Sequence, residues 1–593
     1  MRFFKRMGKN ANYSLNYHCS LSTILLVLLF LLLFLNSCNG NSEEVTPLKK
    51  ASKKCKILTE SLLRRYDGED VQSILNGEIW GESISIPIDW ELRNVLDRSI
   101  AYQISGLQFL DSLYFASKEN INCSSLLLLI HDYIVDFCKN APSYRNQSEW
   151  PWHDDATAFR LIRLSFYYSL YATMYDENEK TIIETCMKDH ISLLLSDDFY
   201  RYGHNHGMHQ DEAVIVYSLL VCDDSNIQMH NLDIALNRTK DYLLQSFTSE
   251  GIHKEHSPEY ALSAVSDLDR FREMVKEIHP QFIAQTEDIK SKSMDYFIQL
   301  TKPDLKYPSV GDSPEIKVND LSFFSVNQYF KYITSRGKEG LSPDLNKVFP
   351  ESGYAFFRSS WTENEEDTTW LMFIAASFSH IHKHGDDLSF LLYHGGDLIT
   401  EAGNRNYNYS DQETSWSYSG YGHNVISIDN ETFAPYISDY DVAMQTKITA
   451  YALPSTLNEG QSYVEAKEFR FKGVEHTRSI TYDCKSNLVI VSDELLCSSE
   501  KPFSFFFHVA EGVSVLMIDN GWEFFRAGKM VARLVISGSS NLTLSEYNKD
   551  SQEYPWCSWI FNGNTDPKYG VLLRGEAQLS SGLNLFEYRF ELY

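Results

Sequence analysis

Residues 380–390 read His-Ile-His-Lys-His-Gly-Asp-Asp-Leu-Ser-Phe, so three imidazoles and two carboxylates stand directly before an apolar segment. Side chains two positions apart on an extended segment point to the same face. We therefore expect His380, His382 and His384 to converge on a metal ion or on one reacting group, because imidazole is both a metal ligand and a proton carrier at neutral pH. The stretch predicts an enzyme.

The hydrophobic periodicity of the chain changes near residue 345. In residues 155–175 the apolar side chains that share one helical face are Phe159, Ile162, Phe166 and Leu170. Further helices are predicted at residues 95–115, 124–138, 180–195, 211–222, 231–247 and 261–278. Their short connections indicate antiparallel helical hairpins, and a chain of 593 residues exceeds one ordinary core, so we expect at least two domains.

After residue 353 apolar and polar residues alternate with period two. The clearest case is the C-terminus, where Phe586, Tyr588, Phe590 and Leu592 alternate with charged residues, as in a half-buried antiparallel strand. Other strands are predicted at residues 371–375, 388–393, 488–491, 503–509 and 571–574. These short runs, separated by turn residues, indicate a β-sandwich. The predicted domains are a helical domain at residues 56–345 and a sandwich at residues 346–593, an α+β multidomain chain.

The N-terminus has the pattern of a secretion signal. Four basic residues in the first nine precede an apolar run of about twelve residues, whereas a helix that spans a bilayer needs about twenty. Leu35-Asn36-Ser37-Cys38 then resembles a bacterial lipobox. We expect residues 1–37 to be a lipoprotein signal peptide, Cys38 to be lipidated and residues 38–55 to be a polar tether. The protein would be exported and anchored in the outer membrane of a Gram-negative bacterium, facing the periplasm or the cell surface; an uncleaved signal anchor is the alternative.

The charge and the cysteines exclude two classes of function. A formal net charge of −27 argues against a nucleic-acid partner, and a polyanionic substrate would need a cleft that gathers Arg, Lys and His locally. The ten cysteines contain no C-x-x-C pair, so they form neither a disulfide scaffold nor a thiolate zinc site. Disulfide pairing is not predictable from their spacing.

A second cluster follows the first stretch. Glu401 lies seventeen residues after His384, and His423 lies farther along. Two imidazoles and one carboxylate are the donors of a zinc site that keeps a fourth position open. Three unrelated polar residues on sandwich loops are the alternative, and a metal held here could act in the reaction or only brace the loops.

Several segments together resemble the heparinase II/III-type polysaccharide lyases. Residues 382–390 resemble the family's HxHxDxLSF signature, residues 202–207 its Asn-His-Gly turn, and residues 255–260 its segment that ends in a catalytic tyrosine. The other matching segments are residues 152–160, 401–403, 423–424 and 474–478. The resemblance implies an incomplete (α/α) toroid followed by an antiparallel β-sandwich, in agreement with the change of periodicity.

The resemblance also implies a reaction, β-elimination at a uronic acid. Asn205 and His206 would hydrogen-bond the sugar carboxylate and stabilise the charge that develops on it. His382 would be the base and Tyr260 the acid that protonates the leaving oxygen, and Tyr260 would do both for some stereochemistries. Taken alone, the Asn-His-Gly triplet is an ordinary turn, and Tyr260 is one of thirty-six tyrosines that could pack in the core.

By the same resemblance His384, Glu401 and His423 would be zinc ligands, although relatives usually carry Asp where this chain has Glu401. The substrate-binding candidates are Trp152, His153, Arg160, Arg405 and Tyr418, with Tyr407 or Tyr409 as alternatives to Tyr418 and Arg163 and Arg201 as further arginines. Guanidinium groups pair with planar anions in bidentate fashion. Taken singly, each arginine is a surface charge and Trp152 a core residue.

The leading hypothesis is an exported lyase for a uronate-containing glycan. Glycosaminoglycans such as heparan sulfate or hyaluronan are the first expected substrates, and alginate-like polymers the second. The expected partners are this acidic polysaccharide and a membrane reached only through the lipid anchor; a homodimer is left open. One rival is a hydrolase, either a zinc hydrolase or a glycosidase with two opposed carboxylates drawn from Asp154, Asp155, Asp211 and Glu212. The other is a noncatalytic glycan-binding lipoprotein.

Overall fold

The computed structural model describes residues 46–63, 68–92, 95, 98–119, 123–141, 150–318, 327–379, 381–406, 408, 410–432, 446–454, 460–551, 558–563 and 566–593. The predicted signal peptide, Cys38, His380, Tyr407 and Tyr409 lie outside these residues. Contacts along the chain separate Met1–Lys50 from Ala51–Tyr593, and the further description concerns the second unit. Within the described residues, no helix combines the length and the apolar character needed to cross a membrane.

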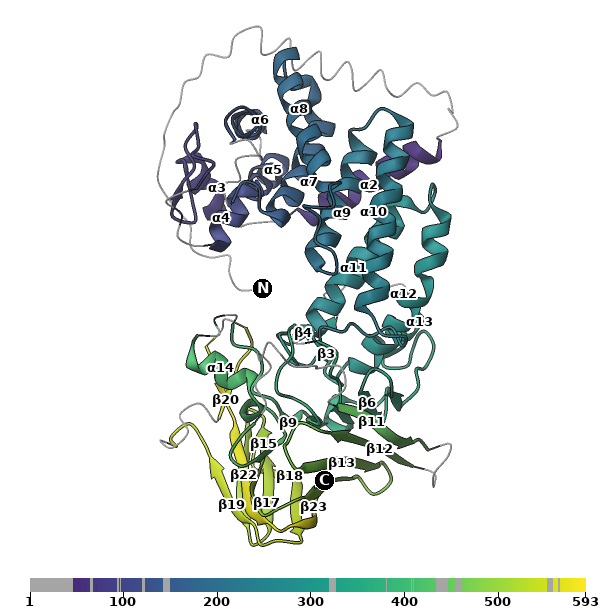
Figure 1. Cartoon of the computed structure of the whole chain (residues 1–593), viewed down its shortest axis with the longest axis vertical. Helices are drawn as coiled ribbons and strands as arrows, with labels where there is room; N and C mark the ends of the chain where they lie inside the picture. Colours follow the sequence, from purple (N-terminus) through teal and green to yellow (C-terminus); the bar gives the residue numbers. More distant parts are fainter. Residues whose placement is uncertain are drawn as a thin grey trace. The chain divides into compact units, whose positions relative to one another are not determined.

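Helices dominate the first half of the described chain (Figure 1, purple to teal). They are α2 (Pro47–Leu62), α3 (Gly68–Leu75), α4 (Arg98–Ser105), α5 (Leu110–Glu119), α6 (Cys123–Asn140), α7 (Asp154–Tyr171), α8 (Glu177–Leu194), α9 (Asn205–Leu220), α10 (Ser225–Ser246), α11 (Pro258–Val275), α12 (Pro280–Leu300) and α13 (Gln328–Thr334). Helices that follow one another pack together, such as α7 with α8, α9 with α10 and α11 with α12. This pattern confirms the predicted helical toroid.

Two helices begin at residues of the candidate site. The first residue of α9 is Asn205, and the N-cap side chain of His204 accepts from the backbone N–H of His206. Helix α11 begins at Pro258, whose fixed φ suits the first helical position, so Tyr260 is the third residue of the helix. Asn205 and Tyr260 therefore both lie in the first turn of a helix.

The second half of the chain forms two antiparallel sheets (Figure 1, green to yellow). The nine-stranded sheet has the order β19-β22-β15-β9-β8-β7-β6-β5, with β10 paired to β15. Its strands are β5 (Lys347–Phe349), β6 (Tyr354–Arg358), β7 (Thr369–Ile374), β8 (Phe390–His394), β9 (Asp397–Thr400), β10 (Ile426–Ile428), β15 (Lys501–Val509), β19 (Thr543–Tyr547) and β22 (Val571–Leu579).

The eight-stranded sheet has the order β11-β12-β13-β14-β23-β18-β17-β16. Its strands are β11 (Thr446–Ala452), β12 (Gln461–Glu468), β13 (Val474–Asp483), β14 (Leu488–Cys497), β16 (Val513–Ile518), β17 (Gly521–Arg526), β18 (Lys529–Gly538) and β23 (Gly582–Leu592). Short paired strands outside the two sheets are β1 (Glu78–Ile79) with β2 (Glu82–Ser83), β3 (Lys306–Tyr307) with β4 (Ile316–Lys317), and β20 (Trp559–Ile560) with β21 (Lys568–Tyr569). The two large sheets confirm the predicted β-sandwich.

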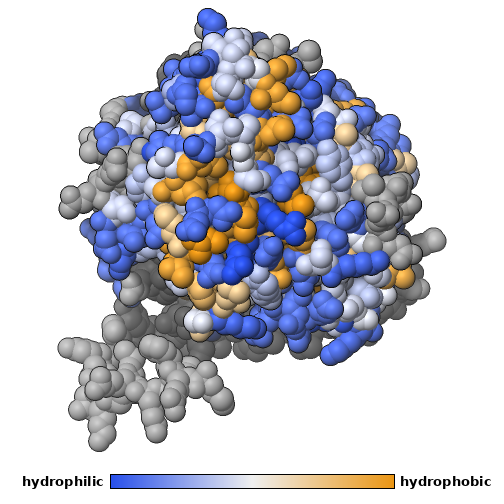
Figure 2. Space-filling view, turned by 90° about the horizontal axis from the view of Figure 1, so that it is seen from below, coloured by the Kyte–Doolittle hydropathy of each residue, from blue (hydrophilic) through white to orange (hydrophobic). Residues whose placement is uncertain are grey.

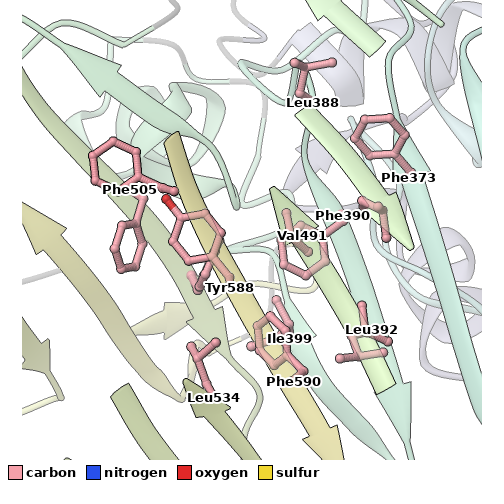
Figure 3. Packing of buried hydrophobic residues seen from close by; sticks show 14 of the residues in the cluster. Phe373, Leu388, Phe390, Leu392, Ile399, Val491, Phe505, Leu534, Tyr588 and Phe590 are labelled. Carbon is pink, nitrogen blue, oxygen red and sulfur yellow. The ribbon is translucent and has the colours of Figure 1, made fainter. Parts of the chain in front are cut away.

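One hydrophobic core lies between the two sheets. Figure 3 shows side chains of both sheets, among them Phe390 and Phe590, gathered in this core. The ring of Phe390 lies 5.3 Å from that of Phe507 and 6.0 Å from that of Phe590, centroid to centroid. Phe390 closes the histidine-rich stretch, so the core fixes the end of that stretch.

The outer face of the eight-stranded sheet also carries apolar side chains. Leu496 on β14 is paired with Leu583 on β23, and Leu585 follows two positions later on the same face. All three are exposed. Figure 2 likewise shows a face on which hydrophobic side chains gather among hydrophilic ones. Such patches of modest size are common on folded proteins.

The alternation on β23 yields a matched pair of substitutions. Phe590 is 0% exposed and Leu585 is 45% exposed. We expect Phe590→Ala to lower the free energy of unfolding by about 3–5 kcal/mol, because it removes a ring from a packed core. Leu585→Ala should change it by less than about 0.5 kcal/mol. Urea denaturation followed by circular dichroism measures both, and equal effects would contradict the assigned faces of β23.

Candidate active site

Residues 381–389 form a turn-rich loop between β7 and β8. His382 and Leu388 have left-handed backbone conformations, with φ of 56° and 60°. The expectation that the imidazoles align on an extended segment is therefore wrong for His382 and His384. The turns instead bring both rings to one carboxylate, that of Asp312, which lies in the loop between β3 and β4.

Asp312 is fully buried and contacts both rings. Its Oδ2 lies 2.6 Å from His382 Nδ1, and its Oδ1 lies 3.0 Å from His384 Nε2. Burial alone would raise the pKa of Asp312, but hydrogen bonds from His382 and His384 hold this pKa well below its usual range. Gly311, at φ 55°, allows the loop to approach: a Cβ there would lie 2.7 Å from the carbonyl oxygen of His256 and 2.8 Å from that of His382. The carboxylate is thus ionised and held in place.

His382 also contacts the toroid through Tyr260. The two rings are stacked, with centroids 3.6 Å apart and an interplanar angle of 17°. His382 Nε2 lies 3.6 Å from Glu255 Oε2, and burial raises the pKa of Glu255. Asn205, Glu255 and Tyr260 line one small pocket. The structure therefore brings Asn205, Tyr260 and His382 together, from two helices and one sandwich loop.

The start of α9 faces two carboxylates at the start of α7. His206 Nδ1 lies 3.1 Å from Asp154 Oδ1, and His206 Nε2 lies 3.4 Å from Asp155 Oδ2. Asp154 also pairs with Arg201, and Asp155 Oδ1 lies 2.8 Å from His209 Nδ1. Burial would lower the pKa of His209, but the nearby carboxylates, Asp155 foremost, raise it to about 9. His209 is therefore an imidazolium at neutral pH, one turn along α9 from Asn205.

Sequence reasoning missed Asp312 and His209. Asp312 follows a glycine in a short hairpin and belongs to no recognisable motif. For His209 a signal was available, because it lies three positions after His206 and so shares a helical face with it.

The three predicted zinc ligands are buried close together. The ring centroids of His384 and His423 are 5.3 Å apart, and His423 Nδ1 lies 3.1 Å from Glu401 Oε1. Besides that pair, three of their polar atoms make no hydrogen bond: His384 Nδ1, Glu401 Oε2 and His423 Nε2. Buried polar atoms are normally paired, and imidazole and carboxylate are donors that zinc accepts. The donor types therefore suit zinc, but among the described residues only the cluster of Asp304, Glu315 and Asp397 has all its ligand atoms within 4.8 Å of one another.

Three other carboxylates lie closer to one another. Within the part of the chain that the structure describes, the ligand atoms of Asp304, Glu315 and Asp397 all lie within 4.8 Å of one another. Lys302 Nζ already lies 3.0 Å from Glu315 and 2.8 Å from Asp397, and Lys306 pairs with Glu315 at 2.7 Å. Two ammonium groups thus neutralise these carboxylates.

Two of the predicted substrate-binding residues are corrected by their burial. Arg160 is 0% exposed, and its guanidinium donates to His190 Nε2 at 2.8 Å and to the carbonyl oxygen of Ser105 at 2.6 Å. Tyr418 is buried as well, and its ring lies 3.9 Å from that of His384. Neither side chain presents a surface to a sugar, so both pack the interior.

The remaining substrate-binding candidates are partly exposed. The ring of Trp152 lies 4.9 Å from that of His190. Arg405 Nε donates to Asp411 Oδ2 at 3.0 Å, and His153 lies beside the carboxylates at the start of α7. Their contact with a substrate stays a prediction.

The four carboxylates considered for a glycosidase are engaged by other side chains, which argues against that alternative. Asp211 is buried and accepts hydrogen bonds from Tyr200 at 2.8 Å and Thr239 at 3.0 Å. Glu212 is buried against Arg270. Asp154 and Asp155 are engaged by the histidines and arginine described above. Arg163, another sequence candidate, pairs with Asp111 in the core.

A buried arginine, Arg478, hydrogen-bonds the backbone next to the candidate site. Arg478 on β13 forms a bidentate pair with Asp493, with N···O distances of 2.7 and 2.8 Å. Its Nη1 donates to the carbonyl oxygens of Leu388 at 2.8 Å and Asn424 at 2.7 Å. One side chain thus ties together the ends of the loops that carry His384 and His423.

Known proteins resemble this chain in sequence and in fold. Residues 343–568 match a family model described as "Heparinase II/III-like, C-terminal". A heparin-sulfate lyase of Bacteroides stercoris is 24% identical over 289 residues, which are 44% of this chain and 40% of that protein. The chain therefore matches less than half the length of this curated relative.

Solved structures extend the likeness of fold to almost the whole chain. A heparan sulfate lyase mutant from Pedobacter heparinus superposes with a TM-score of 0.69 at 15% identity, covering 92% of this chain and 88% of that chain. A heparinase III superposes with a TM-score of 0.71 at 14% identity, covering 97% and 91%. These matches confirm the predicted toroid followed by a sandwich.

The His209 imidazolium predicts a pH dependence of stability. Its pKa is about 9 in the folded chain against an ordinary 6.5, so its stabilising effect is complete below about pH 6.5 and is lost as the pH rises through 9. Between pH 7 and pH 10 the melting temperature of the natural chain should fall more steeply than that of His209→Gln. Differential scanning calorimetry measures both, with exposed His230→Gln as the control. Parallel pH profiles for all three proteins would contradict the raised pKa.

Proposed function

We propose that the chain is a polysaccharide lyase that cleaves a uronate-containing glycosaminoglycan by β-elimination, because residues 343–568 match the heparinase II/III-like family model and a heparin-sulfate lyase is a relative. One observation carries this proposal: Tyr260 stacks on His382 and lines the same small pocket as Asn205. Heparan sulfate and hyaluronan are the first substrates proposed, and alginate-like polymers the second.

The first requirement of the reaction is to neutralise the sugar carboxylate. The C5 proton is too weakly acidic while the adjacent carboxylate keeps its full charge. Asn205 supplies amide N–H donors in the first turn of α9, where the helix dipole favours an anion. The imidazolium of His209 and the ring of His206 lie on the same turn. Together these groups would stabilise the enolate-like charge as it develops.

The second requirement is a pair of proton carriers on one sugar. Because His382 Nδ1 is hydrogen-bonded to Asp312, Nε2 would be the nitrogen that takes the C5 proton. The phenol of Tyr260 would give its proton to the glycosidic oxygen as the C4–O bond breaks and the C4–C5 double bond forms. The stacking of the two rings supports the assignment of both groups to one monosaccharide. For the opposite configuration at C5, Tyr260 would serve as both base and acid.

We also propose that His384, Glu401 and His423 hold a zinc ion. The support is their burial and the three ring and carboxylate atoms, His384 Nδ1, Glu401 Oε2 and His423 Nε2, that make no hydrogen bond. Bound zinc would supply a positive charge that orders the loops beside Asp312. No proton transfer in the proposed reaction passes through it.

The location of the enzyme is a separate proposal. The lipobox-like sequence at Cys38 supports export and anchoring of the mature chain in an outer membrane. Fractionation of cells that express the full chain tests this, since a Cys38→Ser variant should leave the membrane fraction.

Unsaturated product is the direct test of the proposed reaction. Purified protein should raise the absorbance at about 232 nm with one or more uronate polymers, because elimination creates a conjugated double bond and hydrolysis does not. Tyr260→Phe should lower kcat by about 10²–10⁴-fold while the ring and its stacking stay in place. Tyr202→Phe, an exposed hydroxyl, is the matched control. Full activity in Tyr260→Phe would remove the acid assignment, and reducing ends without absorbance would indicate a hydrolase.

Metal analysis tests the zinc proposal. His384→Ala should lower the zinc content and the melting temperature, because it removes one ligand and a ring that contacts Asp312. Mass spectrometry of the purified proteins measures zinc per chain, with exposed His230→Ala as the control. Equal zinc contents in all three proteins, or none in the natural chain, would contradict the assignment.

A further inference from the structure

We infer that Asp312 is a positioning residue that fixes the tautomers of two imidazoles at once, the proposed base His382 and the proposed zinc ligand His384. The inference rests on the proposed function for the role of the base. The geometry, one buried carboxylate between two imidazole rings, is independent of the proposed function.

The first oxygen sets the base. Oδ2 of Asp312 is 2.6 Å from His382 Nδ1, and a carboxylate can only accept, so Nδ1 carries the hydrogen. In the neutral ring the lone pair is then on Nε2, which lies 3.6 Å from Glu255 Oε2, and the ring stacks on Tyr260. An aspartate that holds an imidazole in this way fixes both its orientation and its tautomer.

The second oxygen sets the opposite tautomer in the other ring. Oδ1 of Asp312 is 3.0 Å from His384 Nε2, so the hydrogen of this ring is on Nε2. The lone pair is then on Nδ1, which is buried and makes no hydrogen bond. A carboxylate behind a metal-binding imidazole is the usual arrangement that orients such a ligand. The two histidines therefore need different tautomers, and one residue imposes both.

The loop that carries Asp312 is itself fixed to the helix of Tyr260. The Ser313 hydroxyl lies 2.8 Å from that of Ser257 and accepts from the backbone N–H of Glu259 at 2.7 Å, in the first turn of α11. The Asp312 carbonyl oxygen accepts from Asn404 Nδ2 at 2.8 Å. The carboxylate thus has a rigid position relative to the phenol of Tyr260 as well as to the two rings.

The chemistry of the side chain explains why it is aspartate. Asparagine has one acceptor oxygen and one N–H₂ donor, so it can accept from only one of the two rings. The other ring would have to turn or change its tautomer to accept from the amide. Glutamate keeps two acceptor oxygens but places them one methylene farther from the backbone.

The test is Asp312→Asn in the full chain, with zinc in the buffer. We expect kcat on a uronate polymer to fall by about 10²–10⁴-fold with little change in KM, because binding groups are untouched and the base is misoriented. Zinc per chain should fall, and a crystal structure should show one of the two rings displaced. Asp312→Glu should recover part of kcat. If Asp312→Asn does not fold, the Asp312→Glu variant is used in its place for every measurement.

Asp211→Asn is the matched control. Asp211 is an equally buried carboxylate in the toroid that accepts two hydrogen bonds but faces no imidazole, so its loss should lower the melting temperature and leave kcat and zinc unchanged. If Asp312→Asn keeps the kcat, zinc content and ring positions of the natural chain, the inference is overturned. If the natural chain forms no unsaturated product, the proposed function fails, and zinc content and ring positions alone then decide the inference.

Discussion

A buried carboxylate between the helical and sheet halves of the chain is the constraint around which the site is arranged. Removing an ionised carboxylate from water is costly unless hydrogen-bond donors replace the solvent, and Asp312 obtains them from His382 and His384. Those donors stand on a sandwich loop, whereas the carboxylate stands on a hairpin that follows the last long helix. The interaction therefore exists only when both halves are folded, and the candidate site is assembled by the same contact.

The charge distribution bears on how an acidic chain would bind the acidic substrate proposed for it. The net charge of −27 repels a polyanion at long range, but salt screens that repulsion beyond roughly 8–10 Å. Near the proposed sugar site, α9 carries Asn205 and His206 in its first turn and the His209 imidazolium one turn farther along. Asp154 and Asp155 hold those rings in place and also keep the local charge near balance. Recognition would then depend on hydrogen-bond geometry more than on bulk attraction, which suits release of a charged product.

The sequence predicts most of the fold because the fold follows periodic patterns. Strand β23 matches the predicted 2-residue period, and α7 is a helix as predicted but is buried on nearly all sides rather than on one face. Helices α2, α3, α12 and α13 were not predicted. In the candidate site, local motifs locate Asn205, Tyr260 and His382, whereas Asp312 could not be found because its partners lie seventy or more residues away. Arg160 shows the opposite error. A guanidinium in a motif suggests an anion site, but only the packing of α7 reveals that its donors are already used.

The clamp formed by Arg478 has a consequence for how such an enzyme can change. It holds the backbone at Leu388 and Asn424, and between these points lie β8, β9 and the segment with α14 (Gln412–Tyr418). Both ends are pinned by one guanidinium that stands on β13 of the other sheet, so substitutions at exposed positions of that segment should leave the backbone at Leu388 and Asn424 in place. Substrate preference could thus diverge among descendants of this chain while the reaction stays the same.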